Sequence, residues 1–261
     1  MPELPEIALF KKYVDATSLH KKITSLSFPD TSLLQSPKSD FEKALKGEEF
    51  DETSRIGKYL FLKTTAKPVL VLHFGMTGEL EYYKNQDPPK YAKLIFHFEN
   101  GYQLAYACRR KLGKIYLAES IEEFKKDHFL GKDALDLEEK EFLELLGQKS
   151  GSIKGALTDQ HMVAGIGNVY SDEMLYQCKI HPKTRTGKLS DSDEKRLFKE
   201  MKKVLEMAID KEGERSEFPS DYLISHRKEG EKCPKCSGKI EMIKVSGRST
   251  YFCPECQKEN E

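Results

Sequence analysis

The sequence predicts an α+β fold with a β-rich first half, a helical second half and a small cysteine-rich module at the end. Three observations lead to this prediction. Apolar runs of strand type dominate residues 22–118, helical periodicity dominates after residue 127, and four cysteines cluster between residues 233 and 256. A chain of 261 residues is long enough for more than one domain.

The first half opens with a helix and continues as strands. One face of the helix expected over residues 6–19 carries apolar side chains at helical spacing: Ile7, Phe10, Tyr13 and Val14. Strands are expected at residues 59–62, 69–72 and 94–98. This part is therefore predicted to be an antiparallel β-sandwich with flanking helices.

Two local signals add detail to the β-rich half. Asn100-Gly101 lies between two strand patterns and predicts a two-residue hairpin turn. Ser39, with Glu42 three residues later, has the pattern of an N-cap and predicts a short helix between strands.

The second half is predicted to be helical. Helices are expected at residues 137–146, 152–157, 168–178 and 190–209, with loops rich in Gly, Ser, Thr and Pro between them. A charged stretch at 211–220 is expected to act as a linker. The expected domains are residues 1–126, 127–215 and 222–261.

Composition limits the class of protein. Lys+Arg and Asp+Glu both number 43, so a DNA-binding face would depend on where the charges cluster and not on their sum. No apolar run approaches the roughly 18 residues of a membrane span, and the N-terminus lacks a secretory pattern, so a cytoplasmic protein is expected. Cys108 and Cys178 stand in apolar surroundings and are interpreted as small buried side chains.

The remaining cysteines have the spacing of a zinc site. Cys233-x2-Cys236 and Cys253-x2-Cys256 form two knuckles that can converge tetrahedrally on one Zn²⁺. Four protein ligands leave no position for water, so this zinc is predicted to be structural. A hairpin is expected between the knuckles with Arg248 near its turn, where Arg248 is either a phosphate ligand or merely solvated.

Gly165-Ile166-Gly167-Asn168 is expected to open a helix. Glycines before a helix let the backbone approach an anion, which the N–H groups of the first turn then bind. The alternative is an ordinary glycine-containing turn with Asn168 as the N-cap.

The N-terminus offers a nucleophile. Removal of Met1 would leave Pro2 with a secondary α-amine, whose reference pKa of about 8 leaves a fraction neutral at pH 7. Glu3 beside it is suited to proton transfer. The alternative is a plain helix start, where Pro and Glu are favoured.

Five segments, in this order, resemble those of the formamidopyrimidine-DNA glycosylase / endonuclease VIII family. They lie at residues 1–6, 54–60, 73–78, 165–173 and 247–257, and together they span nearly the whole chain. The resemblance implies a β-sandwich, a helix–two-turn–helix domain and a zinc finger. It also implies that double-stranded DNA with a damaged base or abasic site is held between the two halves.

The resemblance implies roles for single residues. Pro2 would be the Schiff-base nucleophile, Glu3 would protonate the opening sugar ring, and Glu6 would assist at the same centre. Lys58 would belong to the same catalytic centre and would also bind a phosphate near the lesion. The further DNA-binding residues would be Met76, Arg110, Lys154, Asn168 and Arg248. Base flipping is required, because the sugar must reach Pro2.

The implied activity is that of a monomeric base-excision repair enzyme of a bacterial cytoplasm, acting on nucleoid DNA. It would be a glycosylase with abasic-site lyase activity through β- and δ-elimination, and would need no redox cofactor. One alternative is a damaged-DNA-binding member without catalysis, which a retained Met1 would favour because the Pro2 nitrogen would then be an amide. Another is a zinc-ribbon interaction module on an unrelated scaffold.

The chain departs from the family pattern at two places. The formamidopyrimidine branch has Arg-Arg-Phe-Gly in the strand that wedges into the opposite DNA strand. This chain has Arg109-Arg110-Lys111-Leu112-Gly113, one residue longer and without the aromatic ring. Arg110, Lys111 and Leu112 are the candidates for the wedge, and the change is expected to alter which opposite base is tolerated.

The second departure concerns the lesion. The branch specific for 8-oxoguanine carries a long, glycine-rich capping loop before the zinc ligands. Here residues 211–222 are short and charged, with Gly213 as the one glycine. Oxidised pyrimidines, formamidopyrimidines or hydantoins are therefore expected to be better substrates than 8-oxoguanine.

Overall fold

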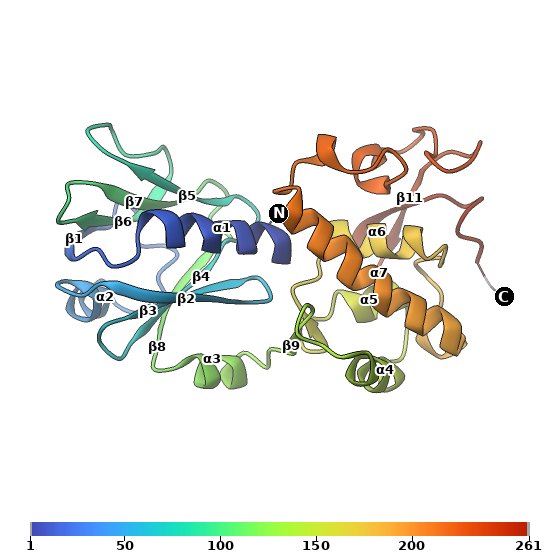
Figure 1. The fold of residues 1–261 in the computed structure, drawn as a ribbon, viewed down its shortest axis with the longest axis horizontal. Helices are drawn as coiled ribbons and strands as arrows, with labels where there is room; N and C mark the ends of the chain where they lie inside the picture. The colour runs from blue at the N-terminus through green and yellow to red at the C-terminus, as the bar shows by residue number, and fades with distance from the viewer. Residues whose placement is uncertain (1, 260–261) are drawn as a thin grey trace. The chain divides into compact units, whose positions relative to one another are not determined.

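A computed structural model describes residues 2–259 of the chain, which divide into two compact units (Figure 1). Within this range, unit 1 comprises Pro2 and residues 6–129, and unit 2 comprises residues 3–5 and 130–259. The predicted α+β class is confirmed. No helix in the described range is long and apolar enough to cross a membrane.

Unit 1 is a β-sandwich of two four-stranded antiparallel sheets. The first has the order β1 (Ile23–Ser27), β6 (Ala92–Phe98), β7 (Gln103–Cys108) and β5 (Gly78–Tyr83). The second has the order β2 (Phe50–Ile56), β3 (Tyr59–Thr64), β4 (Val69–His73) and β8 (Lys114–Ala118). Buried side chains of both sheets form one core, in which the rings of Phe50 and Phe96 meet edge to face at 5.2 Å. The predicted sandwich is therefore confirmed.

Three helices accompany the sandwich: α1 (Leu4–Thr17), α2 (Lys38–Leu45) and α3 (Ile121–Asp127). The predicted apolar face of α1 is confirmed, since Ile7 and Val14 are fully buried in the core of the sandwich. The Phe10 ring stacks on Phe74 at 4.3 Å. Cys108 is buried in the same core, as predicted.

The predicted N-cap of α2 is wrong. The helix begins at Lys38, its N-cap is Pro37, and no side chain caps it. Pro37 fixes φ at −55° and precedes the helix in an extended conformation, so the helix starts two residues earlier than it would with Ser39 as its N-cap. The Ser39 hydroxyl instead donates to Asp40 Oδ1 at 3.3 Å.

The predicted two-residue turn at Asn100-Gly101 is also wrong. Only Gly101 of this pair has a positive φ, at +79°, and its N–H donates to Phe98 O at 3.0 Å. Asn100 stays outside the left-handed region, and its Oδ1 accepts from the N–H of Tyr102 at 3.0 Å. The connection is therefore a longer turn closed by a left-handed glycine, which is the next most common hairpin type.

Unit 2 is built around four helices: α4 (Glu139–Gly147), α5 (Ile153–Leu157), α6 (Asn168–Gln177) and α7 (Asp191–Asp210). All four predicted helices are present, with ends shifted by a residue or two. A short 3₁₀ turn, η1 (Thr186–Lys188), lies between α6 and α7, and two more follow α7, η2 (Arg215–Glu217) and η3 (Leu223–His226). The strand β9 (Lys132–Asp133) pairs with β10 (Val163–Ala164) in parallel. Cys178 is buried in the helical core, as predicted.

Residues 211–220 are more than the linker that their charge predicted. Phe218 and, just beyond, Tyr222 are buried and belong to the helical core. Two aromatic side chains therefore hold this short segment against the helices.

The unit ends in a hairpin of β11 (Glu241–Val245) and β12 (Arg248–Phe252). Its two turn residues, Ser246 and Gly247, both have positive φ, at 49° and 75°, which is the type I′ turn. Arg248 is exposed directly after this turn, where the spacing of the cysteines predicted it.

Candidate functional site

The four predicted zinc ligands converge in unit 2. The Sγ atoms of Cys233, Cys236, Cys253 and Cys256 all lie within 4.8 Å of one another. Two of these separations are 3.5 Å and 3.8 Å, close to the ~3.8 Å edge of a tetrahedron with zinc–sulfur bonds of 2.3 Å. Backbone N–H groups of Lys235 and Gly238 point at two of the sulfurs, as outer-shell donors do around thiolates. The site fits one structural Zn²⁺.

The Glu3 carboxylate occupies the N-terminus of α6. Its oxygens accept hydrogen bonds at 2.8–3.3 Å from three backbone N–H groups, those of Gly167, Val169 and Tyr170. Glu3 is fully buried. The first-turn N–H groups and the helix dipole create an anion site, and the anion is a side chain of the same chain.

Both glycines of the Gly-Ile-Gly motif admit the N-terminal segment. A Cβ on Gly167 would lie 2.2 Å from Glu3 Cδ, and one on Gly165 would lie 2.6 Å from Leu4 Cδ1. The φ of Gly167, −124°, suits any residue, so closeness to Glu3 alone requires glycine there. Asn168 is not the N-cap, which is Gly167. The predicted anion site exists, but the sequence did not reveal that Glu3 fills it.

Pro2 and Glu6 flank this carboxylate along the chain. Pro2 is half-buried and is the first residue that the structure describes; Met1 lies outside the described residues. Glu6 is half-buried in the first turn of α1. Chain connectivity therefore fixes the predicted nucleophile one residue from a rigidly held carboxylate.

Asp172, on α6, is the centre of a buried charge network. It pairs with Lys154 Nζ, and its Oδ2 accepts from Arg227 Nε at 2.9 Å and Nη2 at 2.7 Å. The backbone N–H of Tyr251, on β12, donates to the same oxygen at 3.1 Å. The network ties α5, α6, the segment after η3 and the zinc hairpin together.

This network changes the expected role of Lys154. Its side chain is fully buried, and burial lowers the pKa of Lys154 while the Asp172 carboxylate partly offsets the effect. Its ammonium also donates to Asn168 O at 3.4 Å. A buried and paired ammonium orients its neighbours more readily than it reaches a phosphate.

Asn168 and Arg248 are brought together across 80 residues of sequence. Asn168 Nδ2 donates to Ser249 O at 2.8 Å, next to the exposed Arg248. The Asn168 amide thus fastens the hairpin to the start of α6. These two predicted DNA-binding residues form one polar edge of unit 2.

A group of basic side chains lies at one edge of unit 1. Lys58 follows Gly57 in the two-residue turn between β2 and β3, and His73 pairs in register with Lys114 on β8. Burial, with the charges of Lys58 and Lys114, lowers the pKa of His73 to about 4. His73 is therefore neutral at pH 7 and lies among cations.

Two loops of unit 1 carry exposed side chains side by side. Met76 is 38% exposed and Leu112 is 49% exposed. A Cβ on Gly75 would lie 2.4 Å from the Leu112 carbonyl carbon, so the two backbones touch. The backbone N–H of Arg110 donates to Thr77 Oγ1 at 2.9 Å. Loops 74–77 and 109–113 therefore brace each other, and Arg110 is exposed beside them.

Sequence reasoning missed two residues of this architecture, Asp172 and Arg227. Asp172 lies inside the helix motif at residues 165–173, so the motif pointed to this segment. Nothing in the motif indicated that Asp172 would be the centre of a buried charge network. Arg227 lies in a stretch without periodicity, and no pattern singled it out.

Comparison with known families agrees with this architecture. Residues 1–115 match the formamidopyrimidine-DNA glycosylase N-terminal domain, residues 130–220 match the H2TH domain of the same enzymes, and residues 230–258 match the zinc finger found in FPG and IleRS. The three matches cover most of the chain in one order.

Relatives match over full length. The formamidopyrimidine-DNA glycosylase of Pelotomaculum thermopropionicum is 33% identical over 99% of both chains. A Lactococcus lactis Fpg solved with DNA containing an abasic site is 31% identical, with a TM-score of 0.89 over 98% of this chain and 100% of that one. MutM solved with DNA containing carbocyclic 8-oxo-G is 30% identical, with a TM-score of 0.90 over 99% and 100%.

A β-sandwich, an H2TH helical domain and a four-cysteine finger in one chain define a class of DNA-repair glycosylases. The chain belongs to the formamidopyrimidine-DNA glycosylase family and is a DNA glycosylase of base excision repair.

Proposed function

We propose that this glycosylase removes oxidised bases from double-stranded DNA and then cleaves the abasic strand, with the Pro2 amine as nucleophile once Met1 is removed. The observation that carries this proposal is the Glu3 carboxylate, fixed by three N–H groups one residue from Pro2. A carboxylate anchored in this way can move a proton at a defined place beside the reacting sugar.

The steps follow from amine chemistry. The lone pair of Pro2 attacks C1′ of a flipped nucleotide, and the base leaves with the electrons of the glycosidic bond. Glu3 takes the proton that the Pro2 nitrogen loses after the C1′–N bond forms and passes it to the sugar ring oxygen, so that the ring opens to an iminium. Glu6 assists with positioning. The iminium acidifies the C2′ proton, so β-elimination breaks the C3′–O bond and δ-elimination then breaks the C5′–O bond. Zinc holds the finger and takes no part in these steps.

The phosphates around the lesion would be held by Lys58, Asn168 and Arg248. The exposure of Arg248 and the hydrogen bond that holds Asn168 beside it support this role. Lys154 acts indirectly, because it holds Asp172 and the Asn168 carbonyl. The solved L. lactis relative with abasic DNA supports the same ligand class.

Met76, Arg110 and Leu112 would fill the space left by the flipped nucleotide. Proteins that kink DNA insert apolar side chains between base steps, and Met76 and Leu112 are two of the large apolar side chains exposed in unit 1. Leu112 takes the place of the aromatic wedge in this proposal.

The preferred substrates would be oxidised pyrimidines, formamidopyrimidines or hydantoins. Residues 211–222 are short, and Phe218 and Tyr222 anchor them in the helical core, which leaves little chain to fold over a purine. Excision of 8-oxoguanine opposite cytosine as fast as excision of an oxidised pyrimidine would contradict this preference. The protein would act as a monomer in the cytoplasm of a bacterium, and the organisms of the relatives support the bacterial setting.

Borohydride trapping tests the proposal. The protein, with its N-terminal mass checked, is incubated with duplexes that carry an abasic site, an oxidised pyrimidine or 8-oxoguanine. We expect a covalent adduct that Pro2→Gly abolishes. No adduct on any duplex from protein that lacks Met1 would instead indicate a damage-binding protein without catalysis.

A further inference from the structure

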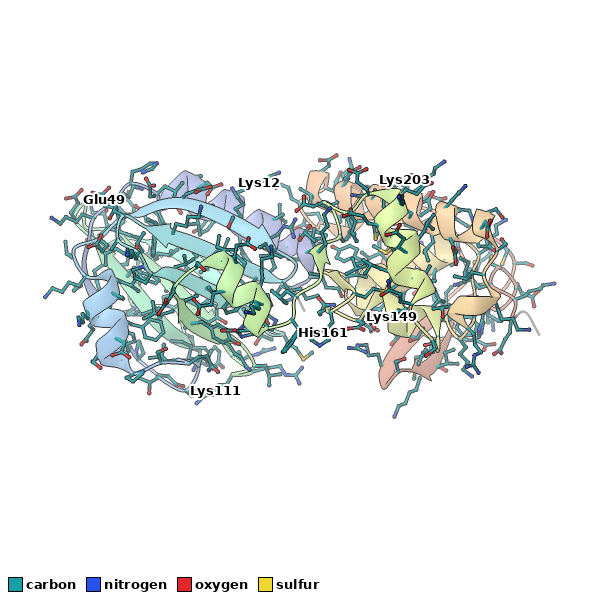
Figure 2. The ribbon with its side chains drawn as sticks, turned by 90° about the horizontal axis from the view of Figure 1, so that it is seen from below. Lys12, Glu49, Lys111, Lys149, His161 and Lys203 are labelled. Carbon is teal, nitrogen blue, oxygen red and sulfur yellow. The ribbon has the colours of Figure 1, made fainter. Side chains whose placement is uncertain are left out.

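Asp30 of unit 1 joins two lysines of unlike exposure. Its Oδ2 lies 2.7 Å from Lys93 Nζ and 2.8 Å from Lys111 Nζ. Lys93 is 4% exposed, whereas Lys111 is 58% exposed and lies at the surface of the unit (Figure 2). Asp30 Oδ1 also accepts from the backbone N–H of Ser32 at 2.9 Å. A buried lysine and a local turn therefore fix the carboxylate that the surface lysine meets.

Lys111 is the strained member of the loop at 109–113. Its φ of 52° lies in the left-handed region, which a non-glycine residue occupies at a conformational cost. The ion pair with Asp30 is a contact that supports this conformation from outside the loop. The charges of Lys111 and Lys93 hold the pKa of Asp30 well below its usual range, so the carboxylate is ionised across working pH.

The loop is also fastened on its other side. Thr77 Oγ1 accepts from the Arg110 N–H, and Gly75 touches the Leu112 backbone. Lys111 thus points to Asp30 while its two neighbours, Arg110 and Leu112, keep exposed side chains. Of the three candidates for the wedge, Lys111 is the one whose side chain is held by an ion pair, with Asp30.

We propose that Asp30 is a positioning residue for opposite-base selectivity: it holds Lys111 away from DNA and fixes the loop that presents Arg110 and Leu112. This inference rests on the proposed function, in which the loop meets the strand opposite the lesion. An exposed ion pair alone does little, but here the carboxylate is held in place by Lys93 and Ser32 before Lys111 binds.

Four proteins test the inference: wild type, Asp30→Asn, Lys111→Met and the double variant. Lys111→Met breaks the pair and leaves Asp30 on buried Lys93, so it controls for the loss of folding that Asp30→Asn could cause. Asp87→Asn, at an exposed aspartate of the same unit, is the matched charge control. The readout is the rate of borohydride trapping on abasic duplexes with A, C, G or T opposite.

We expect the ratio between the best and worst opposite base to fall roughly threefold in each single variant, the size of one surface ion pair. The double variant should match Lys111→Met, because Asp30 acts through Lys111. Asp30→Asn alone should also steepen the salt dependence of binding by about 0.9 in slope, since it frees a cation for one phosphate.

Two results would overturn the inference: ratios in Asp30→Asn equal to those of wild type, or an effect of Asp30→Asn that persists in the Lys111→Met background. Affinity for duplexes with an unreactive abasic analogue, compared across the four opposite bases, is measured in parallel. Absence of trapping by all four proteins, with an opposite-base ratio in binding that is lower in Asp30→Asn and Lys111→Met than in wild type, would refute the lyase proposal and support this inference.

Discussion

The two units carry their site residues in opposite ways. In unit 2 the key charges, Glu3, Lys154 and Asp172, are buried and bonded to one another or to backbone. In unit 1 the corresponding side chains, Met76, Arg110 and Leu112, are exposed on loops above a rigid sandwich. Stability and function are therefore coupled in unit 2 and separable in unit 1.

Removal of zinc should have the largest effect and should stay within unit 2. A structural zinc contributes on the order of 10 kcal/mol to the folding of a small finger. Chelation, or Cys236→Ser, should expose the amides of β11 and β12 to hydrogen exchange and weaken DNA binding at least tenfold, because Arg248 loses its place. Return of Zn²⁺ should restore the wild-type protein. Hydrogen exchange that speeds up equally in β3 and β4 would show that the effect of zinc removal is not confined to unit 2.

Asp172→Asn should give the next largest loss. The change leaves Lys154 buried without its counter-charge, which typically costs about 3 kcal/mol or more. Urea unfolding of the variant should show this loss, together with weaker DNA binding. Asp210→Asn, an exposed aspartate on α7, should stay within about 0.5 kcal/mol of wild type. Equal stability of the two variants would show that the network does not support unit 2.

The two units should also respond oppositely to pH. Burial raises the pKa of Glu173 from 4.5 to about 7. The folded state then binds more protons than the unfolded state between these values, and the stability that Glu173 contributes falls as pH rises, by roughly 3 kcal/mol at most. For His73, whose pKa is lowered from 6.5 to about 4, the unfolded state binds more protons, so its contribution rises over that interval.

Unfolding free energies of Glu173→Gln and His73→Gln, each subtracted from wild type between pH 4.5 and 7.5, measure the two contributions separately. Slopes of opposite sign are expected. Slopes of the same sign would mean that one of the two groups is not buried as described.

The smallest effect on stability is expected at the exposed loops. Leu112→Ala should change the free energy of unfolding by less than about 0.5 kcal/mol, because the side chain is half in solvent. The same variant should slow excision and blur the preference for the opposite base. A matched change at an exposed ring away from these loops, Tyr102→Ala, should leave excision unaltered. A larger loss of stability in Leu112→Ala would indicate that this side chain is packed in a core and is not exposed on a loop.

Sequence predicted the features that depend on local spacing. Two Cys-x2-Cys knuckles are enough to predict a zinc site, and apolar spacing in residues 6–19 was enough to predict the buried face of α1. The predicted cap of α2 was wrong because Pro37, with its fixed φ, starts the helix ahead of Ser39. The predicted turn at Asn100 was wrong because the Asn100 side chain offers the backbone an alternative hydrogen bond.

Contacts across long stretches of chain escaped prediction. The carboxylate of Glu3 fills a helix end more than 160 residues away, and nothing in either segment identifies the other as its partner. The family resemblance implied that Lys154 binds DNA. Its burial depends on Asp172 and Arg227, which only the fold brings near. The spacing of residues along the sequence does not predict which charged side chains pair in a core.

Gly167→Ala tests the central claim most directly, since a Cβ at this position would overlap Glu3 and nothing else in the backbone geometry forbids alanine. The measurement is the rate of borohydride trapping on an abasic duplex. Gly187→Ala is the control, because a Cβ there meets open space. We predict that Gly167→Ala traps at least tenfold more slowly while it retains zinc and that Gly187→Ala traps like wild type. Trapping by Gly167→Ala at the wild-type rate would contradict the assignment of Glu3 as the fixed proton-transfer group beside Pro2.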